Sequence, residues 1–166
     1  MVQAVTVENN RILITGATGF VGQALCRQLM LQKSQFVPEG REDQESKEPS
    51  ETPSSRGLDI QLLIRKPSDF SKIPPGLGAG YILGSMQDEA SLVAACSGRN
   101  QVIHLAGLAH VGRGSVQQAV DTNIQGTRNL LDAAIGAGVR RIVYLSSSLA
   151  EAAASGKGDV TAYGES

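Results

Sequence analysis

The sequence predicts an α/β fold in three layers, with helices on both faces of a doubly wound parallel sheet. Five short apolar segments alternate with turns and with helical patterns, in which apolar residues recur three or four positions apart. The segments are apolar almost throughout, as expected of strands that helices cover on both faces. Because crossovers between parallel strands are right-handed, we expect the strand order 3-2-1-4-5.

The predicted elements follow from these patterns and from the residues that end them. The expected strands are Arg11–Thr15, Ile60–Ile64, Tyr81–Leu83, Gln101–Leu105 and Arg141–Leu145. The expected helices are an amphipathic segment from Phe20 to Met30, Asp88–Cys96 with Asp88 as its cap, and Val116–Ala137 with Gly138 as its stop. Prolines and glycines between residues 74 and 80 predict turns.

The chain of 166 residues suits one domain. Residues 34–57 hold three prolines, six acidic residues and several serines. Such a segment cannot bury enough apolar area to offset the entropy lost on ordering, so it is predicted to be a flexible insertion. A regulatory acidic segment is the alternative hypothesis.

Charge and hydropathy exclude some classes of function. The net charge of −1 provides no electrostatic attraction to nucleic acid or to an anionic membrane. No apolar run approaches the roughly 20 residues that cross a bilayer, and residues 1–10 show no signal peptide. Cys26 and Cys96 are predicted to be buried thiols, and no spacing suggests a metal site. We therefore expect a cytoplasmic protein.

The strongest motif is the glycine-rich segment that follows the first strand. Its residues run Thr15-Gly16-Ala17-Thr18-Gly19-Phe20-Val21-Gly22. Gly16 permits a sharp turn, Gly19 permits close approach of a pyrophosphate, and Gly22 permits close packing of the helix on the strand. The free N–H groups at the helix start attract phosphate, so Gly16, Thr18, Gly19, Phe20, Val21 and Gly22 are predicted to bind a dinucleotide. A turn that serves packing alone is the alternative.

This Gly-x-x-Gly-x-x-Gly spacing resembles the extended short-chain dehydrogenase/reductase family, which includes NAD(P)-dependent sugar-nucleotide epimerases and dehydratases. Further segments resemble that family in the same order: Val102–Gly107, Asn123 within Asp121–Thr127, Val143–Ser148 and Tyr163–Ser166. The resemblance covers the chain except residues 34–57. It implies a Rossmann fold, incomplete at its C-terminal end, with a substrate domain absent. It also implies that Leu105, Ala106, Gly107, Asn123 and Ser146 lie near the cofactor.

The end of the second strand bears on the choice of dinucleotide. An acidic residue there would hold the adenosine ribose and favour NAD. This chain has Arg65 and Lys66, which could pair with a 2′-phosphate, so NADP is favoured slightly over NAD. A solvated basic turn is the alternative. Ser85 and Met86 follow the third strand, where the family often has Asp near the adenine, and they are predicted to contact the cofactor.

The resemblance assigns the catalytic roles to residues near the end of the chain. Tyr163 would be the acid/base, and Ser148, or alternatively Ser147, would bind the substrate oxygen. The family lowers the phenol pKa with a Lys four residues after the Tyr, and this chain ends at Ser166, one position earlier. A surface aromatic is the alternative for Tyr163. His104 is expected to be structural or to line the cofactor site.

The expected function is that of a parent enzyme that epimerises, dehydrates or reduces a nucleotide-linked sugar with NAD(P). The 166-residue chain alone is expected to bind dinucleotide weakly and to be inactive. One alternative substrate is a small ketone or a steroid- or flavonoid-like alcohol. Another alternative is a non-catalytic NADP-binding sensor or a truncated pseudoenzyme. Dimers are frequent in the family through helices that flank the fourth and fifth strands, so a homodimer is one expected state.

Overall fold

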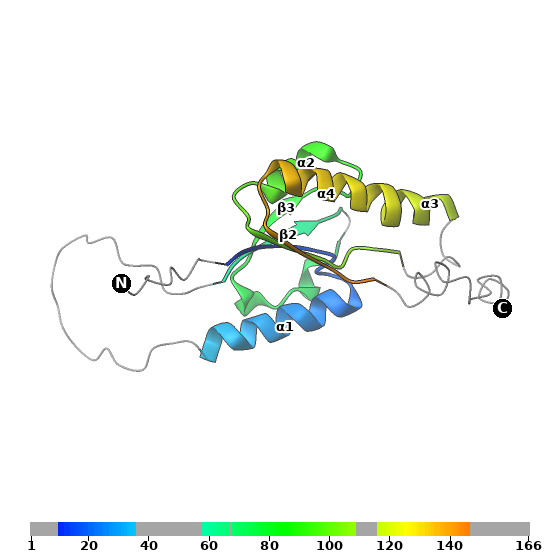
Figure 1. The fold of residues 1–166 in the computed structure, drawn as a ribbon. Coiled ribbons are helices and arrows are strands. Elements are labelled where there is room, and N and C mark those ends of the chain that lie inside the picture. Colours follow the sequence, from blue (N-terminus) through cyan, green and yellow to red (C-terminus); the bar gives the residue numbers. More distant parts are fainter. Residues whose placement is uncertain (1–9, 36–57, 67, 109–115, 147–166) are drawn as a thin grey trace, which may run out of the picture.

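The computed structural model describes residues 10–35, 58–66, 68–108 and 116–146, which form a parallel sheet with helices on both faces (Figure 1). The strands are β1 (Arg11–Thr15), β2 (Asp59–Ile64), β3 (Gly80–Leu83), β4 (Gln101–His104) and β5 (Arg141–Tyr144). Their order is β3-β2-β1-β4-β5, and all neighbouring pairs are parallel. The predicted fold class and strand order are confirmed.

The helices divide between the two faces of the sheet. On one face lies α1 (Phe20–Gln35); on the other lie α2 (Glu89–Cys96) and α4 (Gly126–Gly136), as Figure 1 shows. Two short 3-10 turns, η1 (Phe70–Lys72) and η2 (Pro75–Leu77), connect β2 to β3, where turns were predicted. The sheet therefore forms the middle of three layers.

Alternation along β1 assigns its side chains to two hydrophobic cores. Ile12 and Ile14 belong to the core beneath α1, which also contains Cys26 and Leu62. Leu13 belongs to the core beneath α2 and α4, and it is fully buried. Because successive side chains of a strand point to opposite faces, one apolar strand serves both cores.

Several predicted boundaries differ from the structure by a few residues. The helix α1 continues to Gln35, so it includes the first two residues of the segment 34–57 that was predicted to be a flexible insertion; residues 36–57 lie outside the described residues. Asp88 caps α2 as predicted, because its carboxylate accepts from the Ser91 backbone N–H at 3.2 Å. Gly138 ends the last helix with φ 72°, a conformation that favours glycine.

The long helix predicted after β4 is not a regular α-helix. It consists of α3 (Val116–Val120), a π turn η4 (Asp121–Gln125), and α4. In the π turn the Gly126 N–H donates to the Asp121 carbonyl, five residues earlier. Such a turn takes in one additional residue and often occurs at functional sites. Apolar periodicity did not reveal it.

Coverage of the sheet is uneven. Val143 on β5 is about half exposed, as is Leu145 just after it, whereas the β1 residues from Ile12 to Thr15 are buried. Within the described ranges, no helix is long and apolar enough to cross a membrane.

Candidate functional site

A cavity of about 230 Å³ lies at the carboxyl ends of β1, β2 and β4. In a parallel sheet of this order, ligands bind outside these strand ends, where the order of strands reverses. The cavity is lined by Thr15, Gly16, Thr18, Gly19, Leu63, Arg65, Ser68, Gly84, Ser85, Met86, Gln87, Leu105, Ala106, Gly107, Leu108 and Thr122.

The glycine turn forms one wall of this cavity, and two of its glycines are required by their surroundings. Gly16 has φ 74°, and a Cβ added there would lie 2.5 Å from the Ala106 nitrogen. A Cβ at Gly22 would collide with the Gly16 carbonyl oxygen and lie 2.7 Å from the Ala17 Cα. No L-residue with a side chain fits either place, so the turn passes close to both β4 and α1.

Gly19 differs from these two glycines. It is exposed, it lines the cavity, and the nearest described atom to an added Cβ would be the Gly16 carbonyl oxygen at 3.2 Å. The fold therefore requires a glycine less strictly at position 19 than at positions 16 and 22. A phosphate can bind close to the backbone only where no side chain lies between them.

The first residues of α1 follow Gly19 directly. Phe20, whose side chain is 92% exposed, begins the helix, and Val21 is also exposed. The first N–H groups of an α-helix have no partner inside the helix, and the helix dipole places partial positive charge there. The backbone at Phe20 and Val21 can therefore bind an anion, although their side chains do not line the cavity.

The residues after β2 separate into two groups. Arg65 and Ser68 line the cavity, whereas Lys66 is exposed and does not line it. Of the two basic residues predicted to contact the dinucleotide, the structure brings only Arg65 to the cavity. Ser68 adds a hydroxyl that the sequence analysis did not identify.

The opposite wall comes from the turn after β3. Ser85 and Met86 both line the cavity, together with Gln87. The Ser85 backbone N–H donates to the Ser91 hydroxyl at 3.3 Å, and the Met86 carbonyl accepts from the Asn129 amide at 3.0 Å. These bonds attach the turn to α2 and α4, so the wall is supported from outside the cavity.

Asn123 holds the segment that leaves β4. Its side-chain oxygen accepts from the Leu108 N–H at 2.8 Å, and its side-chain nitrogen donates to the Leu108 carbonyl at 3.0 Å. Both ends of the amide are thus engaged by the backbone. Asn123 does not line the cavity, but Leu108 and the adjacent Gly107 do.

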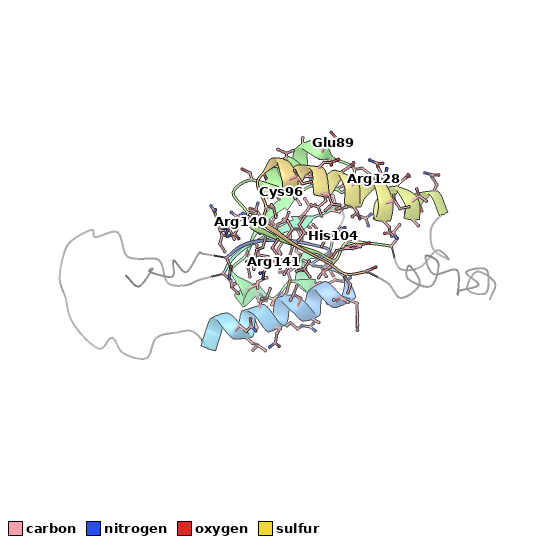
Figure 2. The ribbon with its side chains drawn as sticks, viewed as in Figure 1. Glu89, Cys96, His104, Arg128, Arg140 and Arg141 are labelled. Carbon is pink, nitrogen blue, oxygen red and sulfur yellow. The ribbon has the colours of Figure 1, made fainter. Side chains whose placement is uncertain are left out.

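A chain of buried polar groups lies directly behind the glycine turn. The Thr15 hydroxyl and the His104 Nδ1 are 2.7 Å apart, and the His104 Nε2 and the Thr127 hydroxyl are 3.0 Å apart. The His104 side chain is 1% exposed, and burial lowers its pKa from 6.5 to about 4. Figure 2 shows His104 at the end of the sheet away from Arg140. His104 is therefore a neutral structural residue behind the cavity and does not line it.

The structure brings together nine of the predicted cofactor residues around one cavity. They are Gly16, Thr18, Gly19, Arg65, Ser85, Met86, Leu105, Ala106 and Gly107. The predicted residues that do not line it are Phe20, Val21, Gly22, Lys66, Asn123 and Ser146. Ser146 is exposed just beyond β5. Ser147, Ser148 and Tyr163 lie outside the described residues.

Sequence reasoning missed the polar residues Ser68, Gln87 and Thr122, which also line the cavity, as do Thr15, Leu63, Gly84 and Leu108, which were likewise not predicted as site residues. Each had a weak signal, because each lies within three residues of a position that was singled out. Ser68 follows Arg65, Gln87 follows Met86, and Thr122 precedes Asn123. Their orientation depends on the turns after β2 and β3 and on the π turn, which residue patterns do not specify.

A larger hollow, of about 560 Å³, lies between α2 and α4. Glu89 and Asp132 contribute to it, and none of the residues that line it comes from the glycine turn or a strand end. It is a groove between two surface helices, so the smaller cavity is the candidate functional site. In the part of the chain that the structure describes, no three His, Cys, Asp or Glu residues are grouped as metal ligands.

The chain is similar to known proteins over most of its length. The model of the NAD dependent epimerase/dehydratase family matches residues 12–164. Sterol demethylase protein B of Methylococcus capsulatus is 31% identical over 135 residues, which is 81% of this chain and 34% of that protein. Similarly, 3 beta-hydroxysteroid dehydrogenase type 7 of Rattus norvegicus is 31% identical over 137 residues, which is 81% of this chain and 35% of that protein.

A solved structure of an enzyme is also similar to this chain. The dTDP-glucose 4,6-dehydratase of Streptomyces venezuelae, determined with NAD and TYD bound, has a TM-score of 0.58 and 25% identity, over 80% of this chain and 38% of that one. The chain spans about a third of the length of the curated relatives it matches. With its doubly wound sheet, glycine turn and family match, the chain belongs to the NAD dependent epimerase/dehydratase family, within the extended short-chain dehydrogenases/reductases.

Proposed function

We propose that this chain is the dinucleotide-binding part of an NAD(P)-dependent oxidoreductase or epimerase/dehydratase. The observation that supports this most is the cavity at the carboxyl ends of β1, β2 and β4, into which the exposed Gly19 faces. Close packing against neighbouring backbone explains why Gly16 and Gly22 are glycines. It does not explain Gly19, and close approach of a ligand would.

The residues around the cavity suit the parts of a dinucleotide. The N–H groups at the start of α1 would bind the pyrophosphate beside Gly19. Arg65 and Ser68 would lie at the adenosine ribose, and Ser85 and Met86 at the adenine. When bound, the nicotinamide ring supplies a hydride acceptor or donor.

Dinucleotide titration of a matched glycine pair tests this assignment. Gly19→Ala places a methyl group in the approach to the pyrophosphate, so NAD(P) affinity is expected to fall about tenfold or more, the value of one charge-assisted hydrogen bond. Gly136→Ala is the control, since its added Cβ would meet no described atom within 4 Å apart from its chain neighbours and its own helix backbone. Isothermal titration calorimetry measures both. Equal affinities in the two variants would contradict the proposal.

We propose a preference for NADP over NAD. Arg65 lines the cavity beside Ser68, and a guanidinium binds a phosphate through two parallel hydrogen bonds. The expected result for Arg65→Gln is a loss of about tenfold in NADP affinity with little change for NAD. Lys66→Gln is the matched control, because Lys66 does not line the cavity. Unchanged NADP binding in Arg65→Gln would overturn the preference.

Two substrate classes are candidates for the whole protein. The curated relatives named above favour a sterol or steroid alcohol, whereas a nucleotide-linked sugar remains the expectation from the motifs and from the dTDP-glucose dehydratase structure. In either case we propose that Tyr163 donates or accepts the proton at the substrate oxygen. Ser148, or alternatively Ser147, would bind that same oxygen. A full-length protein containing this chain, assayed on both substrate panels, decides between them. Tyr163→Phe is expected to abolish turnover but not dinucleotide binding.

A non-catalytic NADP sensor is the remaining alternative, and the same assay tests it. A sensor would bind NADP tightly and convert no member of either panel. Loss of turnover on Tyr163→Phe in an active full-length protein would exclude it. The 166-residue chain is proposed to bind dinucleotide weakly and to be inactive by itself, which steady-state assays of the chain would check.

We also propose that the chain dimerises through α3 and α4. Four exposed apolar residues, Val120, Ile124, Leu131 and Ile135, lie along this continuous helical segment, with Ile135 73% exposed. One such stripe is self-complementary about a two-fold axis. Ile135→Lys should then give a monomer by light scattering, whereas Leu31→Lys on α1 should not.

We further propose a cytoplasmic location, since Cys26 and Cys96 are buried free thiols.

A further inference from the structure

The hydrogen bonds behind the glycine turn have a direction that can be derived from their partners. The Thr127 hydroxyl donates to the Asn123 carbonyl at 2.8 Å. A hydroxyl has one proton, and a carbonyl cannot donate. The Thr127 oxygen must therefore accept from the His104 Nε2, 3.0 Å away, so the ring nitrogen that carries the proton is Nε2.

The other end of the imidazole follows from this assignment. In a neutral ring with a proton on Nε2, Nδ1 is an acceptor. The Thr15 hydroxyl, 2.7 Å from Nδ1, must then donate to it. The Thr15 oxygen in turn accepts from the Ala106 N–H at 3.3 Å. Every group uses its one proton once, in a single direction from Ala106 to the Asn123 carbonyl.

The reverse direction would leave groups unsatisfied. If Nδ1 carried the proton, Nε2 would need a donor, and Thr127 could supply one only by releasing the Asn123 carbonyl. Thr15 is fully buried and His104 is 1% exposed, so an unpaired group at either residue would cost about 1–3 kcal/mol. Burial, which lowers the pKa of His104 to about 4, also keeps the ring neutral.

Both ends of this hydrogen-bond chain are connected to residues that line the cavity. Thr15 is the residue before Gly16, and both it and Ala106 line the cavity, whereas His104 and Thr127 do not. At the far end, Asn123 belongs to the π turn and holds Leu108 through its side chain. The His104 ring also stacks on Tyr144 of β5, with centroids 5.1 Å apart. His104 thus connects the glycine turn to the helix that holds the segment after β4.

We propose that His104, as the neutral Nε2–H tautomer, is a positioning residue that fixes the glycine turn against the π turn of the helix and so sets the shape of the dinucleotide cavity. The proposal rests on the function proposed above for its effect on binding. The direction of the hydrogen-bond chain belongs to the protein without ligand.

The tautomer is tested by long-range ¹H–¹⁵N spectra of the chain with ¹⁵N-labelled histidine, which distinguish a ring N–H from a bare ring nitrogen. His104 and His110 are the two histidines of the sequence, so the signals that remain in His110→Gln are those of His104. We expect the proton of His104 on Nε2. A proton on Nδ1, or a charged ring at neutral pH, would overturn the proposal, and the measurement leaves every residue of the hydrogen-bond chain unchanged.

Variants at Thr127 test the positioning role. Thr127→Val removes the acceptor of Nε2–H, whereas Thr127→Ser retains the hydroxyl and serves as the conservative control. In Thr127→Val we expect a changed tautomer population and faster amide exchange at Ala106, by about tenfold, the value of one hydrogen bond. We also expect weaker dinucleotide binding, although Thr127 does not line the cavity. Thr127→Ser should resemble the wild type in all three measurements.

The outcomes separate this inference from the proposed function. If the wild type binds neither NAD nor NADP, the proposed function fails, while the tautomer and the Ala106 exchange still decide the hydrogen-bond chain. If the wild type binds dinucleotide but Thr127→Val changes neither exchange nor affinity, His104 is a packing residue and the inference fails.

Discussion

The amino ends of the parallel strands form one edge of the sheet, called here the amino edge, and their carboxyl ends form the carboxyl edge. The two satisfy their polar groups in opposite ways. At the amino edge, buried Asn100 joins three strands: its side chain accepts from the Arg11 N–H at 2.9 Å, and its carbonyl accepts from the N–H groups of Arg140 and Arg141. At the carboxyl edge, the glycine turn and the strand ends surround a cavity. The protein closes one edge with its own hydrogen bonds, and at the other edge it leaves a cavity.

This contrast separates stability from binding. Changes at the amino edge should alter the free energy of unfolding alone, because no residue there lines the cavity within the described part of the chain. At the carboxyl edge the two effects depend on the residue, since some groups support the fold and others face the cavity. Three substitutions and a change of pH test this separation, and they follow in decreasing order of their expected effect.

Gly16→Ala should have the largest effect on stability. The position has φ 74°, and the added Cβ would lie 2.5 Å from the Ala106 nitrogen. Strain and collision together are expected to destabilise the fold by about 3 kcal/mol or more. Urea unfolding measures the change, with Gly136→Ala as the control. A loss of under about 1 kcal/mol would mean that the turn can move away from β4.

Acid should weaken the carboxyl edge through His104. Its pKa is lowered to about 4 in the folded chain, from 6.5, so between these values the unfolded chain binds the proton and the folded chain does not. Stability is therefore complete above about pH 6.5 and falls as the pH is lowered toward 4, by up to about 3 kcal/mol. Unfolding free energies across this range should show a steeper slope for the wild type than for His104→Gln. Parallel slopes would contradict it.

Asn100→Ala should destabilise the amino edge without changing binding. The variant leaves the partly buried Arg11 N–H without its side-chain acceptor, which costs about 1 kcal/mol, the net value of one hydrogen bond. Dinucleotide affinity, measured well below the unfolding temperature, should stay the same. Gln101→Ala is the matched control, since its side chain bonds the exposed Asn10. A change in affinity would show that the two edges are coupled.

The smallest effect is expected at the ion pair between Arg99 and Asp59, whose charged atoms are 2.8 Å apart. Asp59 is 52% exposed, so water and salt screen the pair. Asp59→Asn is expected to cost about 0.5–1 kcal/mol, and less at high salt. Thermal unfolding at two salt concentrations measures this. A loss above about 2 kcal/mol would indicate that Arg99 depends on this carboxylate for burial of its charge.

Much of the fold could be predicted because the elements have local signals. The five apolar segments lie between turns, and the order of the strands follows if the sheet is doubly wound with right-handed crossovers. The cap at Asp88 and the stop at Gly138 depend only on neighbouring residues, and both were found. The π turn was not predicted, because it is defined by a backbone hydrogen bond, from the Gly126 N–H to the Asp121 carbonyl, and apolar periodicity does not report on that bond.

The candidate site could be predicted less completely. Gly16 and Gly19 were identified from spacing, but their different surroundings depend on how close β4 lies to the turn. Arg65 and Lys66 are adjacent in sequence, and only the backbone after β2 decides which of them lines the cavity. The part played by His104 could not be derived from the sequence, because its partners Thr15 and Thr127 are 89 and 23 residues away.

The π turn also limits how this helix can change length during evolution. Its hydrogen bond spans five residues rather than four, so the turn takes in one residue more than a regular α-helical turn does. A deletion of one residue within Asp121–Gln125 would leave a regular helix that still spans the same layer. It would also remove the turn that sets the position of Asn123 relative to Thr127 and Leu130 of α4, and Leu130 packs on the sheet. In this segment a single-codon deletion should thus be harder to tolerate than most substitutions.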